Sequence, residues 1–232
     1  MKAFMTFIPL CFYLIIGQSD GILMAQTLTS TEKCKNSRQF GDINVCLPTI
    51  TGMTECYSNP TIKGRADKLY QVGSTVLGAY INNQIYGKIE NLDEIVFDDY
   101  FFIYAVNKLQ GAKIGTPELD NVFNLMTGNF LKETWEELKS KIEKFHDYLV
   151  SIGKPVILDS YAPNAKTRTG IFLTKMTLDN KEMINISILN VMEIKQRMIF
   201  SSYTLKFDGE GSIKVAKAKN EYFVSKFITE NK

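Results

Sequence analysis

The last third of the chain constrains the fold most, because apolar and polar residues alternate there over successive short segments. Between residues 184 and 194 the alternation is broken only by Asn190. A period of two is typical of a β-strand with one buried face. Residues 179–181 and 195–197 are polar and predict the turns that join this strand to its neighbours. The pattern therefore predicts an antiparallel meander over residues 155–207.

Helical patterns precede and follow this meander. Thr116 and Pro117 favour a helix start, with threonine as the cap and proline first in the helix, and that helix should end near Gly128. Over residues 131–152, around Trp135, apolar side chains recur at spacings of four and three, which predicts an amphipathic helix. A third helix is expected after its cap, Ser212. The order predicts an α+β fold: an antiparallel β-sheet (meander) with helices packed on it, similar to an α-β-α sandwich.

The first half of the chain predicts the remaining strands. Residues 43–47 alternate and stop at Pro48, and further strands are expected over 53–57, 68–72, 76–81 and 84–89, with a loop over 58–68. Aromatic residues fall on both parities of segment 96–106, which indicates a central strand covered on both faces.

The first 25 residues have the pattern of a secretory signal peptide. Lys2 precedes an apolar run over residues 3–16, and small and polar residues lead to Ala25, where cleavage is expected. The alternatives are an uncleaved membrane anchor, for which the run is short, and a buried helix. We expect an exported protein, periplasmic or secreted, and the abundance of Lys, Asn and Ile is typical of an AT-rich bacterial genome.

Composition limits the domain number and the partners. Residues 26–40 are polar and unpatterned and are interpreted as an N-terminal arm, whereas residues 41–232 are of a size for a single α+β domain. The net charge is +2 at pH 7 and the lysines are scattered, so nucleic-acid binding is not expected.

Three cysteines remain after the expected cleavage: Cys34, Cys46 and Cys56. In an oxidising compartment one disulfide is expected, as Cys34–Cys46 or as Cys34–Cys56, and either would tie the arm to the first strand. The spacings are longer than those that zinc sites favour, so no metal is expected.

Two regions of the sequence resemble the PsbP-like α-β-α sandwich superfamily. Residues 43–48, followed by Gly52 and Met53, resemble its opening strand, and the Tyr203 strand, the 209–211 turn and the closing helix resemble its ending. The resemblance covers about a quarter of the chain after the signal peptide. It implies a non-catalytic accessory or binding role and assigns no site residues.

Few residues could support catalysis. The single histidine, His146, lies at the edge of the apolar stripe of the 131–152 helix, where a boundary or surface position is expected. The sequence lacks a nucleophile elbow, a phosphate-binding loop and a zinc-binding HExxH motif, so no catalytic residue and no cofactor is assigned. Asp98 and Asp99 are adjacent in a predicted strand and should point to opposite faces, which fits the solvated start of a buried strand.

Two groups of residues are candidates for ligand binding. Tyr100 and Tyr104 share the parity of Asp98 and could line a pocket beside it, although core tyrosines with hydroxyls at the rim give the same pattern. The predicted loop over residues 162–170 carries Lys166 and Arg168, whose donors would suit a carboxylate or phosphate, or would be ordinary surface charges.

Three hypotheses follow. The first is an exported, cofactor-free binding or accessory protein that contacts a protein or small ligand outside the cytoplasm through loops at one end of the sheet. The second is a cofactor-independent hydrolase with Asp98 or Asp159 as general base, which predicts a carboxylate in an apolar cleft. The third is a structural protein held at the membrane by an uncleaved leader. The sequence favours a non-enzymatic role.

Overall fold

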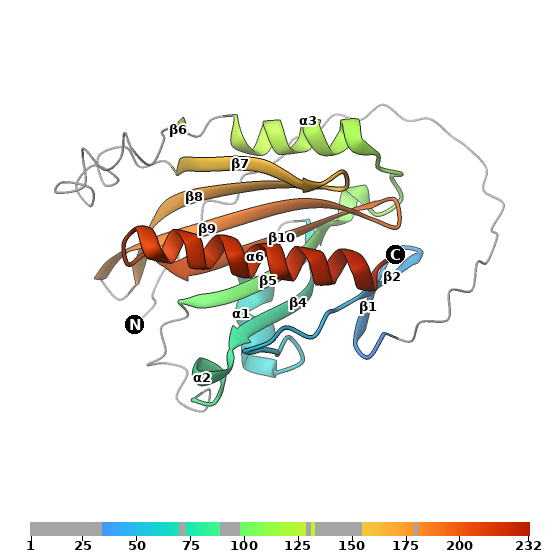
Figure 1. The fold of residues 1–232 in the computed structure, drawn as a ribbon. Coiled ribbons are helices and arrows are strands. Elements are labelled where there is room, and N and C mark those ends of the chain that lie inside the picture. Colours follow the sequence, from blue (N-terminus) through green and yellow to red (C-terminus); the bar gives the residue numbers. More distant parts are fainter. Residues whose placement is uncertain (1–33, 70–72, 89–97, 129–130, 133–154, 179–180) are drawn as a thin grey trace.

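The computed structural model describes residues 34–69, 73–88, 98–128, 131–132, 155–178 and 181–232 (Figure 1). Its strands are β1 (Ser37–Phe40), β2 (Ile43–Cys46), β3 (Met53–Glu55), β4 (Ser74–Asn82), β5 (Asp99–Val106), β6 (Leu131–Lys132), β7 (Val156–Asn164), β8 (Thr167–Leu178), β9 (Lys181–Ile194) and β10 (Arg197–Lys206). Its helices are α1 (Pro60–Leu69), α2 (Asn83–Tyr86), the 3-10 turn η2 (Asn107–Leu109), α3 (Thr116–Thr127) and α6 (Glu210–Glu230). Within these ranges no helix is long and apolar enough to span a membrane.

Eight strands form one sheet in the order β3-β4-β5-β10-β9-β8-β7-β6. Neighbouring strands are antiparallel except β6 and β7, and β1 and β2 form a separate hairpin. The strands β7 to β10 follow one another as hairpins, which confirms the predicted meander. The α+β fold class is likewise confirmed.

Helices cover both faces of the sheet and give three layers (Figure 1). On one face α6 buries Phe223 and Phe227 against the long central strands. On the other face α1 packs on β4 and β5 through Ile62, and α3 packs on β9 and β10 through Leu119 and Phe123. The central position of β5 is confirmed, because its side chains join clusters on both faces.

Three predictions in the first half of the chain differ from the structure. Helix α1 replaces most of the predicted loop over 58–68 and the first two residues of the strand predicted over 68–72, and the rest of that strand lies outside the described residues. The start of α1 is capped by Asn59, whose side chain accepts hydrogen bonds from the backbone N–H groups of Thr61 and Ile62 at 3.0 and 3.3 Å. In the segment predicted as a strand over 84–89, residues 84–86 belong to the short helix α2, which Asn82 caps, residues 87–88 form a turn, and residue 89 lies outside the described residues. In both cases an asparagine that reads as a turn residue begins a helix.

Several other segments differ in detail. The predicted loop over 162–170 is a tight hairpin, because β7 extends to Asn164 and β8 begins at Thr167. The end of the predicted arm forms β1, which pairs with β2. Helix α3 is capped by Gly115, not by Thr116, and α6 by Gly209, not by Ser212. The predicted 131–152 helix falls almost wholly outside the described residues, as do the signal peptide and His146, and residues 131–132 form β6.

Candidate functional site

Several turns meet at one end of the sheet, which we call the hairpin end: the β7–β8 turn (165–166), the β9–β10 turn (195–196), the β1–β2 turn (41–42), the segment 107–115 and the start of α3 (Figure 1). Backbone hydrogen bonds join these turns. The N–H of Glu193 donates to the carbonyl of Lys166 at 2.9 Å, and the N–H of Ile114 donates to that of Gln196 at 3.0 Å. The hairpin end is therefore a fixed surface built from distant parts of the chain.

Arg168 lies at this end but its guanidinium is already occupied. Arg168 is the second residue of β8, and its side chain donates hydrogen bonds to both carboxylate oxygens of Asp120 on α3. The hydrogen bond from Arg168, and then its charge, lower the pKa of Asp120. Only 15% of the Arg168 side chain is exposed, against 49% for Asp120. An incoming anion would have to displace Asp120 to reach this guanidinium.

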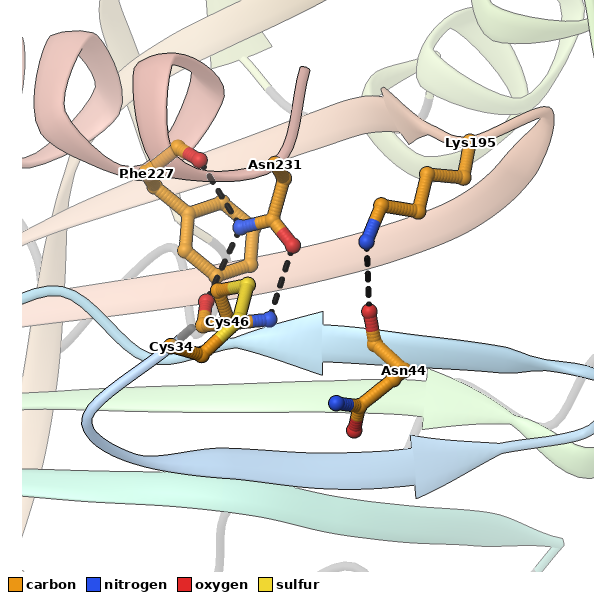
Figure 2. The surroundings of a disulfide bond; sticks show 6 residues. All are labelled: Cys34, Asn44, Cys46, Lys195, Phe227 and Asn231. Carbon is orange, nitrogen blue, oxygen red and sulfur yellow. Dashed lines mark hydrogen bonds between the residues drawn. A yellow bond between two sulfur atoms is a disulfide. The ribbon is translucent and has the colours of Figure 1, made fainter. Parts of the chain in front are cut away.

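Lys166 is more accessible than Arg168. Its ammonium lies 2.8 Å from Oε1 of Glu193, and 54% of its side chain is exposed. Lys195, on the adjacent turn, donates to the backbone carbonyl of Asn44 at 2.8 Å (Figure 2). Each ammonium has three donors and one hydrogen-bond partner among the described residues, so each can donate to a further acceptor group from outside.

Arg197 and Asp42 complete the hairpin end, and the sequence interpretation missed both. The guanidinium of Arg197 donates to both carboxylate oxygens of Asp42, with Nη2 at 2.8 Å from each. The Arg197 side chain is 8% exposed, so this pair lies partly inside the molecule and attaches the β1–β2 hairpin to β10. A carboxylate 155 residues away leaves no local signal in the sequence.

Tyr100 and Tyr104 lie on the sheet face opposite α6, within apolar clusters. Tyr100 is buried beneath α1 and packs edge-on against Phe102, and burial raises its pKa. Tyr104 is half-buried and stacks on Phe200 in the cluster beneath α3, and burial raises its pKa as well. Asp98 is half-buried, and its backbone carbonyl accepts the N–H of Lys206 at 2.8 Å. These contacts place both tyrosines in the packing of the core.

Asp99 departs from the prediction of a solvated strand start, because it is 7% exposed. Its Oδ1 accepts the hydroxyl of Tyr203 at 2.8 Å. Its Oδ2 accepts Nδ2 of Asn82 at 2.9 Å and the ammonium of Lys219 at 2.6 Å. Both oxygens of this buried carboxylate are therefore hydrogen-bonded. Tyr203 and Lys219 lie more than 100 residues away in sequence, so no local motif could reveal the cluster.

Asp159, the other proposed base, lies on β7 and contacts α6 through Lys217. Its Oδ2 is 2.9 Å from the ammonium of Lys217, which also lies over the ring of Tyr161 at 4.4 Å from its centroid. The Asp159 side chain is 44% exposed, which does not match a carboxylate in an apolar cleft. Among the described residues no group of three His, Cys, Asp or Glu side chains could hold a metal ion.

The structure contains the Cys34–Cys46 disulfide, the first of the two pairings left open by the sequence (Figure 2). Asn231 at the end of α6 accepts the N–H of Cys46 at 2.8 Å and donates to its carbonyl at 2.9 Å. Cys56 is a buried free thiol, and burial, followed by the charge of Glu55, raises its pKa to about 12. The disulfide and Asn231 together attach the start of the domain to its last helix.

No family model, curated protein or solved structure matches this chain.

Proposed function

We propose that this is an exported, non-catalytic binding or accessory protein that contacts a protein partner outside the cytoplasm through the hairpin end. The observation that carries the proposal is the fixed charge arrangement there: two arginines are held by the chain's own carboxylates, and beside them two lysines each have one hydrogen-bond partner in the described part of the chain. A surface held in one conformation loses little entropy on binding.

The carboxylates nominated for hydrolysis give that alternative little support. Asp159 is half exposed and is paired with Lys217. Asp98, the other nominated base, is only half-buried and so does not lie in an apolar cleft. The buried carboxylate beside it, Asp99, has both oxygens occupied by three donors. A general base needs a free lone pair within hydrogen-bond reach of the substrate proton. The resemblance of the sequence to the PsbP-like superfamily implies an accessory role of the same kind.

A pull-down with charge-reversed variants tests the proposal. The exported protein is isolated from its native envelope or culture fluid, and co-purifying proteins are identified by mass spectrometry. We expect the double variant Lys166→Glu/Lys195→Glu to retain less than about a tenth of the partner. The two glutamates would face the partner groups that the lysines attract, and like charges across an interface repel. The control is Lys214→Glu on α6, whose side chain is 77% exposed. Equal retention by both variants would contradict the proposed surface.

Export itself is tested by the intact mass of the protein recovered outside the cytoplasm. We expect a chain that begins at Gln26, since cleavage after Ala25 fits the signal pattern. A recovered chain that keeps residues 1–25 would instead support the membrane-anchored alternative.

A further inference from the structure

The β9–β10 turn at the hairpin end holds a backbone conformation that its residues disfavour. Arg197 pairs with Ile194, so Lys195 and Gln196 form a two-residue turn, and their φ angles are 48° and 60°. Positive φ at both central positions is the mark of a type I′ turn, which favours asparagine and glycine. In other residues the Cβ atom then crowds the following carbonyl oxygen, which costs folding free energy. Lysine and glutamine therefore weaken the turn that they form.

Elsewhere in the described residues the chain avoids this cost. Glycine occupies the other positions with positive φ, which are Gly41, Gly52, Gly73 and Gly209. Gly41 lies in the β1–β2 turn, so glycine is used at this same end of the sheet where the backbone requires it. Lys195 and Gln196 are the exception within the described ranges, and the exception falls in the surface proposed to bind a partner.

Contacts on both sides hold the turn in this conformation. The backbone carbonyl of Gln196 accepts the N–H of Ile114 at 3.0 Å, and the ammonium of Lys195 donates to the carbonyl of Asn44 at 2.8 Å. A disfavoured backbone conformation persists where its surroundings over-determine it, and such positions cluster at functional sites. The turn is therefore a fixed feature of the surface.

These contacts leave both side chains available to a partner. Gln196 is bonded through its backbone carbonyl, which any residue supplies, and its side chain is exposed. The ammonium of Lys195 has one partner in the described part of the chain and can donate to another group. An ammonium suits a carboxylate, and a carboxamide can both donate to and accept from a peptide group. Together they suit an acidic side chain and the main chain beside it.

We propose that Lys195 and Gln196 determine which partner the hairpin end binds, and that this partner presents an acidic side chain on an exposed stretch of main chain. The inference rests on the proposed binding role of the hairpin end. The ammonium of Lys195 pairs with the carboxylate, and the carboxamide of Gln196 pairs with the adjacent main chain. The protein keeps these two groups at the expense of stability, a trade-off that is common at binding sites.

The test is the double variant Lys195→Asn/Gln196→Gly, which has the residues that a type I′ turn favours. We expect its melting temperature to rise by about 2 to 4 °C, because asparagine and glycine adopt positive φ more readily. In a pull-down from the native envelope or culture fluid, we expect it to retain less than about a tenth of the partner that wild type retains, since a charged and a neutral hydrogen bond are lost. Gln196→Gly alone, which keeps the ammonium, should retain an intermediate share.

Two further measurements control for stability and for charge. Gly209→Ala introduces a side chain at φ 80°, beyond the end of β10 that is opposite to its turn. It should lower the melting temperature and leave retention of the partner unchanged. Retention by wild type should fall as the salt concentration rises from about 0.05 to about 0.5 M, because salt screens charge pairs at a surface. Retention that does not change with salt would overturn the acidic partner.

The remaining outcomes separate this inference from the proposed function. Lower stability in Lys195→Asn/Gln196→Gly would overturn the inference, because the turn residues would then serve the fold. Wild-type retention by that variant would overturn it as well, and the proposed surface would stand if Lys166→Glu/Lys195→Glu still lost the partner. If wild type retains no partner, or if the charge-reversed variant retains it, the surface and the inference are both wrong.

Discussion

Asn190 is a polar residue within the apolar face of β9, and it lies fully buried beneath α6. Its Nδ2 donates to Oδ1 of Asn220 at 2.7 Å, and Nδ2 of Asn220 returns a hydrogen bond at 3.0 Å. Nδ2 of Asn190 also donates to the hydroxyl of Ser201, and the hydroxyl of Thr169 donates to Oδ1 of Asn190. A reciprocal pair of this kind is satisfied in one register of α6 on the sheet only, so it fixes where the helix lies.

Removal of either asparagine should therefore destabilise the fold. We expect Asn190→Ala and Asn220→Ala each to lower the free energy of unfolding by roughly 1 to 3 kcal/mol, because the remaining amide is buried without its partner. The double variant should lose less than the sum, by at least about 0.5 kcal/mol. Urea unfolding measures all three. The exposed Asn44→Ala is the control, and strict additivity of the pair would contradict this account.

Cys56 offers a second prediction at the scale of one residue. Its pKa of about 12, against an ordinary 9.0, means that the folded state holds the neutral thiol. The contribution of this thiol to the free energy of unfolding is complete below pH 9, the ordinary pKa, and is lost as the pH rises from there through about 12. We expect the thiol to resist iodoacetamide at pH 8 in the folded protein and to react once urea unfolds it. Rapid alkylation of the folded chain would contradict its buried position.

At the scale of elements, the β1–β2 hairpin depends on attachments at both of its ends. The disulfide closes a sequence separation of 12, Asn231 holds the backbone of Cys46, and Arg197 holds Asp42 in the turn. The sequence predicted that a disulfide would tie the arm to the first strand. It could not select the partner from spacing, because the choice depends on where Asn231 and Arg197 place the hairpin.

The contribution of the disulfide can be measured directly. We expect Cys34→Ser/Cys46→Ser to lower the free energy of unfolding by about 3 kcal/mol, since a loop of this length is then unconstrained in the unfolded chain. Wild-type protein with and without dithiothreitol is the matched comparison, and reduction should reproduce the variant. Unchanged stability in both would contradict a structural role for the bond.

Helix α3 is attached to the hairpin end by the Asp120–Arg168 pair, which is sensitive to acid. Because the pKa of Asp120 is lowered from 3.8, its contribution is present above that value and is lost as the pH falls through the lower folded pKa. We expect Asp120→Asn to lower the melting temperature at pH 6, with the difference from wild type shrinking below pH 3.8. A difference that is independent of pH would contradict an ionic contribution.

At the scale of the whole molecule, periodicity predicted the sheet well and the side-chain clusters poorly. The alternation around Ile186 predicted β9 because burial of one strand face is a local pattern. The start of α1 was missed because Asn59 and Pro60 favour turns and helix starts alike. The Asp99 cluster could not be predicted, since its donors come from β4, β10 and α6 and meet only after folding.

The same limit applies to the hairpin end. The sequence analysis identified Lys166 and Arg168 as charged residues of the predicted loop over 162–170, and the structure places both at the hairpin end. Glu193 beside Lys166, and the neighbouring Lys195 and Arg197, follow from the antiparallel order of β8 to β10, whereas Asp120 beside Arg168 comes from α3. Sequence alone could therefore nominate two residues but not the surface.

Site-specific photo-crosslinking tests the central claim, that the hairpin end is the surface that contacts the partner. A photoreactive residue replaces Gln196, which is exposed on the β9–β10 turn, or Ser225, which is exposed on α6. The exported protein is irradiated in its native envelope or culture fluid and adducts are identified by mass spectrometry. We predict a discrete protein adduct from position 196 and none from position 225. An adduct from position 225 alone would contradict the claim and move the interface to α6.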